Sequence, residues 1–163
     1  MNADPVRDSR RLETLTQRLL GVFYGVYNEL GYGFLESVYD EAFAIALAEA
    51  GISHRRQVSL PVLFRGLPVG YFKADFVVEE AIVVELKSVQ EIDKAHISQL
   101  LNYLRASKLE LGFIMNFGPE AHFRRFAFSN SRKGNLRHLR SSAAPNQHPG
   151  RAGPSAPEAH PSS

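Results

Sequence analysis

The sequence predicts a single domain of the α/β or α+β class, in which helices pack on a central mixed sheet. Apolar residues recur at helical spacing in three segments, and five further segments have the length and apolar content of strands. The third helical segment lies between two strands, where it can form the crossover that joins parallel strands, and the two strands before it form a predicted hairpin. A sheet with both kinds of pairing is therefore expected.

The composition suits one compact domain and excludes cysteine chemistry. The chain has 163 residues, of which 44% are hydrophobic, and it contains no cysteine. Disulfides and thiolate metal sites are therefore excluded, and among the remaining ligands hard oxygen atoms favour Mg²⁺ or Mn²⁺. We expect a lead-in over residues 1–11, a folded domain over residues 12–128, and a disordered tail over residues 129–163 that is rich in Ser, Pro, Gly, Ala and Arg.

The net charge of +2 conceals an uneven distribution. Residues 1–128 carry 14 Lys and Arg against 16 Asp and Glu, whereas residues 129–163 carry 5 against 1. The predicted domain is therefore slightly acidic. It is not a basic nucleic-acid-binding domain by bulk charge, and only local patches can bind phosphates.

Two helices are expected before the first strand. Apolar residues at helical spacing predict a helix over about residues 10–30, which the Gly-Tyr-Gly segment at residues 31–33 ends. A second helix runs from about Leu35 to Gly51. The apolar run at residues 19–27 follows several arginines, as in a signal peptide, but acidic residues precede it and it is too short to span a bilayer. We therefore expect a cytoplasmic protein without a membrane segment.

Five strands and a third helix make up the rest of the predicted domain. The expected strands are residues 56–64, 68–78, 81–88, 109–115 and 122–128. Asp93 can cap the third helix, about residues 94–107, because its carboxylate can accept hydrogen bonds from the first backbone N–H groups. The expected core stripe of this helix is Ile97, Leu100, Leu101 and Leu104.

The predicted hairpin between residues 73 and 87 contains three charged groups among apolar ones. Glu85 and Lys87 are two residues apart and must share a face of their strand. A turn centred on Glu80 makes Asp75 the direct cross-strand neighbour of Glu85, whereas a slip of one residue would turn the acids into the core. This register pairs Phe76 with Val84, Val77 with Val83, Val78 with Ile82 and Ala74 with Leu86. The face that carries Ala74, Phe76, Val78, Ile82, Val84 and Leu86 is then wholly apolar and expected to be buried.

Two interpretations of the charged face remain open. Directly opposed carboxylates destabilise a strand pair, since two unit charges about 4 Å apart repel by roughly 4 kcal/mol at an effective dielectric near 20. Lys87 relieves this repulsion in part, and a divalent cation relieves it more fully. The alternative is an exposed sheet face on which the same charges are solvated. The strands alone favour neither interpretation.

Other polar residues lie on the predicted helices. Glu36 borders the buried face of the second helix, where it either approaches the acids of the sheet or serves the helix N-terminus through capping or the macrodipole, and its spacing alone favours the second role. Gln99 and Tyr103 lie one turn apart on the third helix, on a polar stripe that faces away from Ile97 and Leu101. Such a stripe is usually a solvated helix face.

Several motifs follow one another in a characteristic order. Residues 33–39 form a G-x-x-E-x-x-Y motif, Asp75 precedes the Glu-Leu-Lys segment at residues 85–87, and the segments QLLNY at residues 99–103 and LGFIMNFG at residues 111–118 follow. In these motifs the chain resembles the GxxExxY family, a small member of the PD-(D/E)xK nuclease-like superfamily, over about residues 12–128. It departs from the pattern at Ala74, where a proline precedes the aspartate in the family.

The resemblance implies a restriction-endonuclease-like core and a nuclease that depends on Mg²⁺ or Mn²⁺, with DNA favoured over RNA as its substrate. The implied metal ligands are Glu36, Asp75, Glu85 and the backbone carbonyl of Leu86. Lys87 would orient or help to deprotonate the attacking water, and Gln99 and Tyr103 would position Lys87, the water or a phosphate. The alternative is a catalytically inactive protein of the same fold that binds or scaffolds a partner, but the presence of all three carboxylates and Lys87 favours the enzyme.

Overall fold

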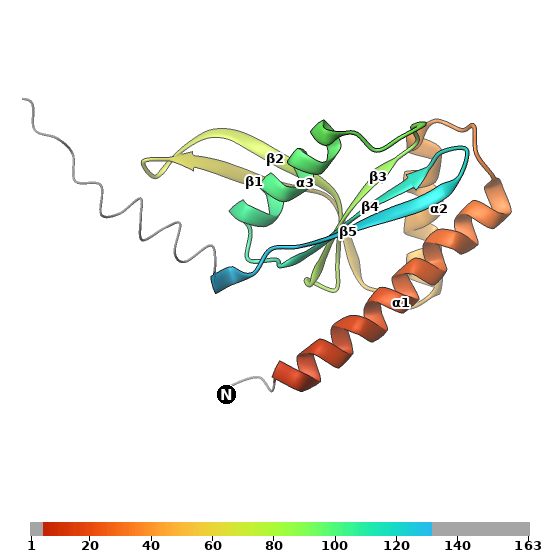
Figure 1. Ribbon diagram of the computed structural model, residues 1–163, viewed down its shortest axis with the longest axis horizontal. Coiled ribbons are helices and arrows are strands. Elements are labelled where there is room, and N and C mark those ends of the chain that lie inside the picture. The colour runs from red at the N-terminus through yellow and green to blue at the C-terminus, as the bar shows by residue number, and fades with distance from the viewer. Residues whose placement is uncertain (1–4, 132–163) are drawn as a thin grey trace, which may run out of the picture.

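The computed structural model describes residues 5–131, which form a sheet with helices on both faces (Figure 1). In chain order the elements are α1 (Pro5–Leu30), α2 (Glu36–Glu49), β1 (His54–Phe64), β2 (Leu67–Val78), β3 (Ile82–Lys87), α3 (Lys94–Ala106), β4 (Leu111–Phe117) and β5 (Ala121–Ala127). The predicted number, type and order of the elements are confirmed. The largest difference is at α1, which begins about five residues earlier than expected, with a proline in the first position, where its missing N–H costs nothing.

The sheet has five strands in the order β1-β2-β3-β4-β5. All neighbouring strands are antiparallel except β3 and β4, which are parallel and are joined through α3. The predicted mixed sheet and its helical crossover are therefore confirmed, and the fold belongs to the α+β class. The expected tail, residues 129–163, lies almost entirely outside the described residues.

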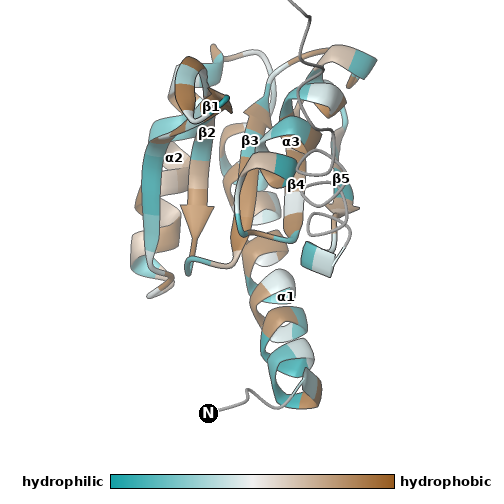
Figure 2. Cartoon of the chain, turned by 90° about the vertical axis from the view of Figure 1, so that its left-hand side faces the viewer, coloured by the Kyte–Doolittle hydropathy of each residue, from teal (hydrophilic) through white to brown (hydrophobic). Residues whose placement is uncertain are grey.

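Each face of the sheet is covered by a separate hydrophobic cluster. Helices α1 and α2 cover one face through Leu19, Phe23, Tyr39 and Phe43, and α3 covers the other through Leu100, Tyr103 and Leu104. Strands β3 and β4 lie between the two layers and are buried on both faces, and Figure 2 shows β3 coloured mainly as hydrophobic. Continuous apolar strands are typical of the parallel part of a sheet.

The predicted hairpin register is confirmed near the turn and fails farther from it. Phe76 pairs with Val84, Val77 with Val83 and Val78 with Ile82, as expected. The ladder between β2 and β3 stops there. Ala74 was predicted on the face of Phe76 and Leu86, but it packs instead in the cluster under α3. The alternation of side chains along β2 is therefore interrupted at Asp75.

Strands β1 and β2 continue together well beyond this interruption. They pair from Val58 with Ala74 to Phe64 with Leu67, and Figure 1 shows this part of the hairpin reaching past the rest of the sheet beside α3. Within residues 5–131, no helix has the length and apolar character that crossing a membrane requires.

Candidate active site

The site begins where β2 and β3 separate, directly after the pair formed by Phe76 and Val84. Asp75 is half-buried at this point, and its Oδ2 accepts a hydrogen bond of 2.8 Å from the backbone N–H of Leu86. The Asp75 carboxylate therefore accepts a hydrogen bond from a backbone N–H of β3 that would have bonded to a β2 carbonyl if the ladder had continued. The predicted direct pairing of Asp75 with Glu85 is replaced by this side-chain contact, which still brings the two acids together.

Gln57 lies on the other side of Asp75, in β1. Its φ angle is +51°, in the left-handed region that a glutamine within a strand rarely adopts, although the residues on both sides of it pair regularly with β2. Its Nε2 lies 3.5 Å from Asp75 Oδ1. This distortion explains why Ala74 changes face, since a local twist at Gln57 and Asp75 breaks the two-residue alternation. The sequence contains no signal for it, because no glycine or proline marks the position.

Glu85 is the most deeply buried acid of the site. It is 2% exposed, and its Oε1 is buried without a hydrogen-bond partner among the described residues. Burial and, to a smaller extent, the neighbouring Asp75 together raise the pKa of Glu85 to about 9, against the opposing effect of Lys87. The interpretation of a solvated charged face is therefore wrong for this residue. An unpartnered carboxylate oxygen in such a place calls for a bound group to satisfy it.

Lys87 and Glu36 face each other at the end of β3. The Lys87 Nζ lies 3.8 Å from Glu36 Oε1, and the Lys87 side chain is only 14% exposed, against 45% for Glu36. Burial raises the pKa of Glu36, Lys87 and the Ser88 backbone lower it, and Asp75 raises it. The capping alternative is therefore wrong, because the N-cap of α2 is Leu35, which makes no side-chain capping bond, and the carboxylate of Glu36 interacts with β3 and its loop. The macrodipole alternative is not contradicted, because Glu36 lies in the first turn of α2.

The motif around Glu36 fixes the loop that carries it. Gly33 has a φ angle of +107°, which only glycine adopts readily. The hydroxyl of Tyr39 donates a hydrogen bond of 2.7 Å to the Gly31 carbonyl, and its ring stacks on Phe117 with the centroids 4.4 Å apart. The spacing of the G-x-x-E-x-x-Y motif therefore has a physical basis, since the glycine turns the chain and the tyrosine anchors it to the core on either side of Glu36.

A second set of contacts holds the loop that follows Lys87. The amide of Asn116 clamps residue Val89, accepting from its N–H at 3.0 Å and donating to its carbonyl at 2.8 Å. A Cβ atom at Gly118 would lie 2.1 Å from the Val89 carbonyl oxygen, so only glycine fits there. Ser88 Oγ, in turn, donates to the Phe34 carbonyl at 3.1 Å. These contacts join the Lys87 loop to the Glu36 loop, and none was predicted.

Helix α3 places its two predicted residues differently. Tyr103 is buried against the sheet, where burial raises the pKa of its hydroxyl, Arg55 lowers it and Glu85 raises it. The expectation of a solvated stripe is therefore wrong for Tyr103. Gln99 is exposed, and no recorded hydrogen bond joins it to the other candidate residues in the described part of the chain. The predicted N-cap at Asp93 is confirmed.

The acids of the site carry negative charge without full compensation. Asp75 raises the pKa of both Glu85 and Glu36, and Lys87 is the cation that opposes it at each of them. Across residues 5–131, no three His, Asp or Glu side chains lie as close together as a metal site requires. The donors are nevertheless all oxygen atoms, and the unpartnered Oε1 of Glu85 adds a free acceptor. This chemistry fits a hard divalent cation.

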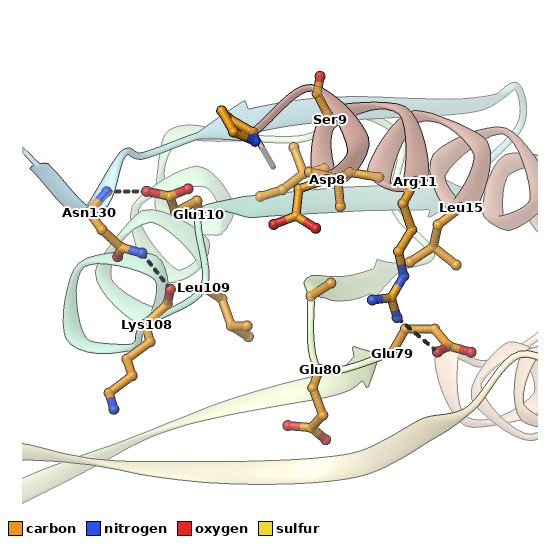
Figure 3. A pocket seen from close by; sticks show the side chains of 14 residues that line it. Asp8, Ser9, Arg11, Leu15, Glu79, Glu80, Lys108, Leu109, Glu110 and Asn130 are labelled. Carbon is orange, nitrogen blue, oxygen red and sulfur yellow. Dashed lines mark hydrogen bonds and ion pairs between the residues drawn. The ribbon is translucent and has the colours of Figure 1, made fainter. Parts of the chain in front are cut away.

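A separate hollow of about 620 Å³ lies between α1, the β2–β3 turn and the start of β4, at the opposite end of β3 from Lys87 (Figure 3). Arg11 reaches across it to Glu79, with 3.9 Å between nitrogen and oxygen, and Asn130 contacts Glu110 and the Lys108 carbonyl. The hollow contains none of the predicted site residues. The candidate active site is therefore the shallow cluster at the open end of β3.

Comparison with protein families identifies the class of this chain. Residues 13–126 match the model of the PD-(D/E)XK nuclease superfamily, and the chain therefore belongs to that superfamily, whose members typically use divalent metals. This membership confirms the predicted superfamily. Among curated proteins, none matches the chain.

Two solved structures are similar to the chain. An alkaline exonuclease from Laribacter hongkongensis is 12% identical, with a TM-score of 0.45 over 87% of this chain and 79% of the exonuclease. The protein SSO0001 is 16% identical, with a TM-score of 0.44 over 83% of this chain and 71% of SSO0001.

Proposed function

We propose that this protein is a metal-dependent nuclease that hydrolyses phosphodiester bonds, with Mg²⁺ or Mn²⁺ as cofactor and DNA as the favoured substrate. One observation carries the proposal: in a chain of the PD-(D/E)XK nuclease superfamily, Glu85 is buried beside Asp75 with one carboxylate oxygen unpartnered. Buried acids of this kind destabilise a fold unless something compensates them, so their presence favours a use.

The residues divide into ligands and a proton-handling group. The proposed ligands are Glu36, Asp75, Glu85 and the backbone carbonyl of Leu86. When bound, the metal would polarise a phosphoryl oxygen and lower the pKa of water. Asp75 is held for this role by the Leu86 N–H on Oδ2, and its Oδ1 has only a long hydrogen bond of 3.5 Å from Gln57 Nε2, which a cation can replace. Lys87 orients the attacking water, helps to remove its proton, and offsets charge on the phosphate.

The remaining proposals concern positioning and family. The charge of Glu85 contributes to the raised pKa of the Tyr103 hydroxyl, so Tyr103 lies near the site, and we assign it a positioning role. Gln99 is assigned to phosphate or water contacts, for which its exposure on α3 leaves it free. The G-x-x-E-x-x-Y motif around Glu36 further supports membership of the GxxExxY family, with residues 12–128 as the nuclease domain.

The test of this function is a cleavage assay with the full chain. End-labelled single- and double-stranded DNA and RNA are incubated with Mg²⁺, Mn²⁺ or EDTA, beside Asp75→Asn, whose amide oxygen can still accept the Leu86 N–H. We expect cleavage with metal only, faster on DNA, and none by the variant. A folded protein that cleaves no substrate with either metal would overturn the proposal in favour of a binding or scaffold protein of the same fold.

The role of Glu36 can be tested separately. Replacing it with glutamine keeps the shape and one acceptor but removes the charge. If Glu36 is a ligand, Mn²⁺ affinity measured by isothermal titration should fall by about tenfold or more, a loss of ~1.4 kcal/mol, while the free energy of unfolding changes by less than about 0.5 kcal/mol.

Glu49→Gln is the matched control, because it removes one exposed acid from the other end of the same helix. It should leave Mn²⁺ affinity unchanged. Equal affinities of the Glu36 and Glu49 variants would remove Glu36 from the ligand set.

A further inference from the structure

The part of the β1–β2 hairpin that lies beyond Asp75, residues 58–74, is called here the arm. It starts at the candidate active site and leads away from it. The ladder between β2 and β3 stops at Phe76 and Val84, and β2 extends nine residues from there to Leu67, paired only with β1. At about 3.3 Å per residue this part of β2 is roughly 30 Å long. Figure 1 shows it reaching beyond the other strands.

One side of the arm is packed and the other is open. Val58, Leu60 and Phe72 pack into the cluster under α3. Tyr71 follows the opposite face, because successive strand residues alternate, and it is 69% exposed. The large exposed hydrophobic residues of the arm are Leu63, Phe64, Leu67, Val69 and Tyr71. So large an exposed apolar surface on one projecting element indicates a binding surface.

The positive charge of the arm indicates which class of partner it can bind. Its two charged residues are Arg65 and Lys73, and it contains no acid, whereas the predicted domain as a whole is slightly acidic. In the part of the chain that the structure describes, neither cation forms an ion pair with a carboxylate. Arg65 lies over the ring of Phe64, 5.0 Å from its centroid. Unpaired cations beside exposed rings complement a polyanion that also presents aromatic bases.

The base of the arm adjoins the candidate site, because Asp75 directly follows it in β2. Tyr32 and Phe34, in the loop before Glu36, are also exposed aromatic residues. A strand of nucleic acid that lies along the open face of the arm would therefore reach the acids at its base. A second copy of the chain fits this face less well, because contact between two arms would bring the positive charges of Arg65 and Lys73 close to those of the other copy.

We propose that the arm binds a single-stranded segment of nucleic acid, with bases stacked on Tyr71 and Phe64 and phosphates contacted by Lys73 and Arg65. This rests on the proposed function, because it assigns the arm to the substrate of the same site. Single strands suit it because their unpaired bases offer free faces for stacking, whereas the bases of a duplex are already stacked on one another.

The test measures binding without cleavage. Affinities of the full chain for fluorescein-labelled oligo(dT), oligo(U) and a DNA duplex are measured by fluorescence anisotropy in EDTA. Tyr71→Ala should weaken binding of the single strands by about fivefold or more, the loss of one stacked base. Tyr71→Phe should bind like the wild type because it keeps the ring. Ile45→Ala should also do so, since Ile45 is an exposed residue on α2, outside the arm.

The salt dependence provides a second readout. Lys73→Gln should reduce the slope of log affinity against log salt by about 0.7, the value for one phosphate contact on a single strand. A variant that is merely less stable should keep the wild-type slope of log affinity against log salt, because it keeps the phosphate contact. Thermal unfolding of each variant checks that the exposed substitutions leave the fold intact.

The outcomes separate this inference from the proposed function. If Tyr71→Ala and Lys73→Gln bind single strands as tightly as the wild type while the wild type cleaves DNA, the arm proposal is overturned and the nuclease stands. If binding depends on Tyr71 but no substrate is cleaved with either metal, the arm proposal stands and the nuclease fails. If light scattering shows a dimer that Tyr71→Ala dissociates with unchanged affinity for nucleic acid, the arm is a self-association surface and the proposal is overturned.

Discussion

Replacing Lys87 with alanine is expected to lower kcat/KM for nucleic acid cleavage by about 100- to 10,000-fold, the contribution typical of a positioned proton-transfer group. The ammonium lies 3.8 Å from Glu36 Oε1 and opposes the charge of Asp75 at Glu85. Its side chain is largely buried, so water replaces it poorly. Metal affinity measured by isothermal titration should change much less than the rate, because lysine is not a ligand.

Two variants control this experiment. Lys108→Ala removes an exposed lysine beside the hollow at the other end of the sheet, and it should cleave at the wild-type rate. Lys87→Arg keeps the charge but not the geometry of a single ammonium, and it should remain strongly impaired. A Lys87→Ala enzyme that cleaves within about twofold of the wild type, less than 0.5 kcal/mol of transition-state stabilisation, would remove Lys87 from the chemistry.

The hairpin shows how far a periodic pattern predicts structure. Burial of the apolar face selects one register, and the pairs from Phe76–Val84 to the turn follow it. The same rule fails at Ala74, because it assumes that both strands stay regular. The left-handed conformation of Gln57 breaks that assumption, and no local sequence preference indicates it. The distortion lies beside Asp75, a proposed metal ligand, and backbone strain is common at functional sites.

The helix residues show a different limit. Local spacing around Glu36 favours a capping role, and only the tertiary position of α2 beside the end of β3 gives it Lys87 as a partner. For Tyr103 a signal was present in the sequence: it lies three residues after Leu100 and next to Leu104, so it shares their buried face. Tyr103 also lies one turn after the polar Gln99, and this spacing led to the wrong prediction that both residues are solvated.

The contacts that join the loops of the site could not be predicted at all. Ser88 reaches Phe34, and Asn116 clamps Val89, over separations of 54 and 27 residues. No local periodicity encodes such contacts, because each depends on the sheet order that places β3 beside β4. The residues of the proposed site could therefore be predicted from the sequence, but the contacts that orient them could be seen only in the structure.

Replacing Glu85 with glutamine is expected to stabilise the metal-free protein in alkaline solution. The pKa of Glu85 is about 9 in the folded chain against an ordinary value of 4.5, so between these two pH values the folded state binds a proton that the unfolded state does not. The free energy of unfolding of the wild type should therefore fall as the pH rises through this range. Glutamine carries no such charge and can donate a hydrogen bond toward Asp75. Near pH 8 the variant should be more stable by about 1–4 kcal/mol, because at this pH Glu85 must take up on folding a proton that the unfolded chain has released.

Thermal and denaturant unfolding in EDTA across this pH range measure the effect. Below the ordinary pKa of a glutamate the two proteins should differ little, because Glu85 is then protonated in both the folded and the unfolded state. Glu120→Gln, at an exposed loop position, should keep the wild-type pH slope. Added Mn²⁺ should stabilise the wild type most at alkaline pH, since the ion binds the ionised carboxylates, and should stabilise Glu85→Gln much less. A wild-type stability that stays level or rises between neutral and alkaline pH in EDTA would mean that Glu85 is already ionised and compensated by the protein itself, and the argument for a cation at this site would lose its main support.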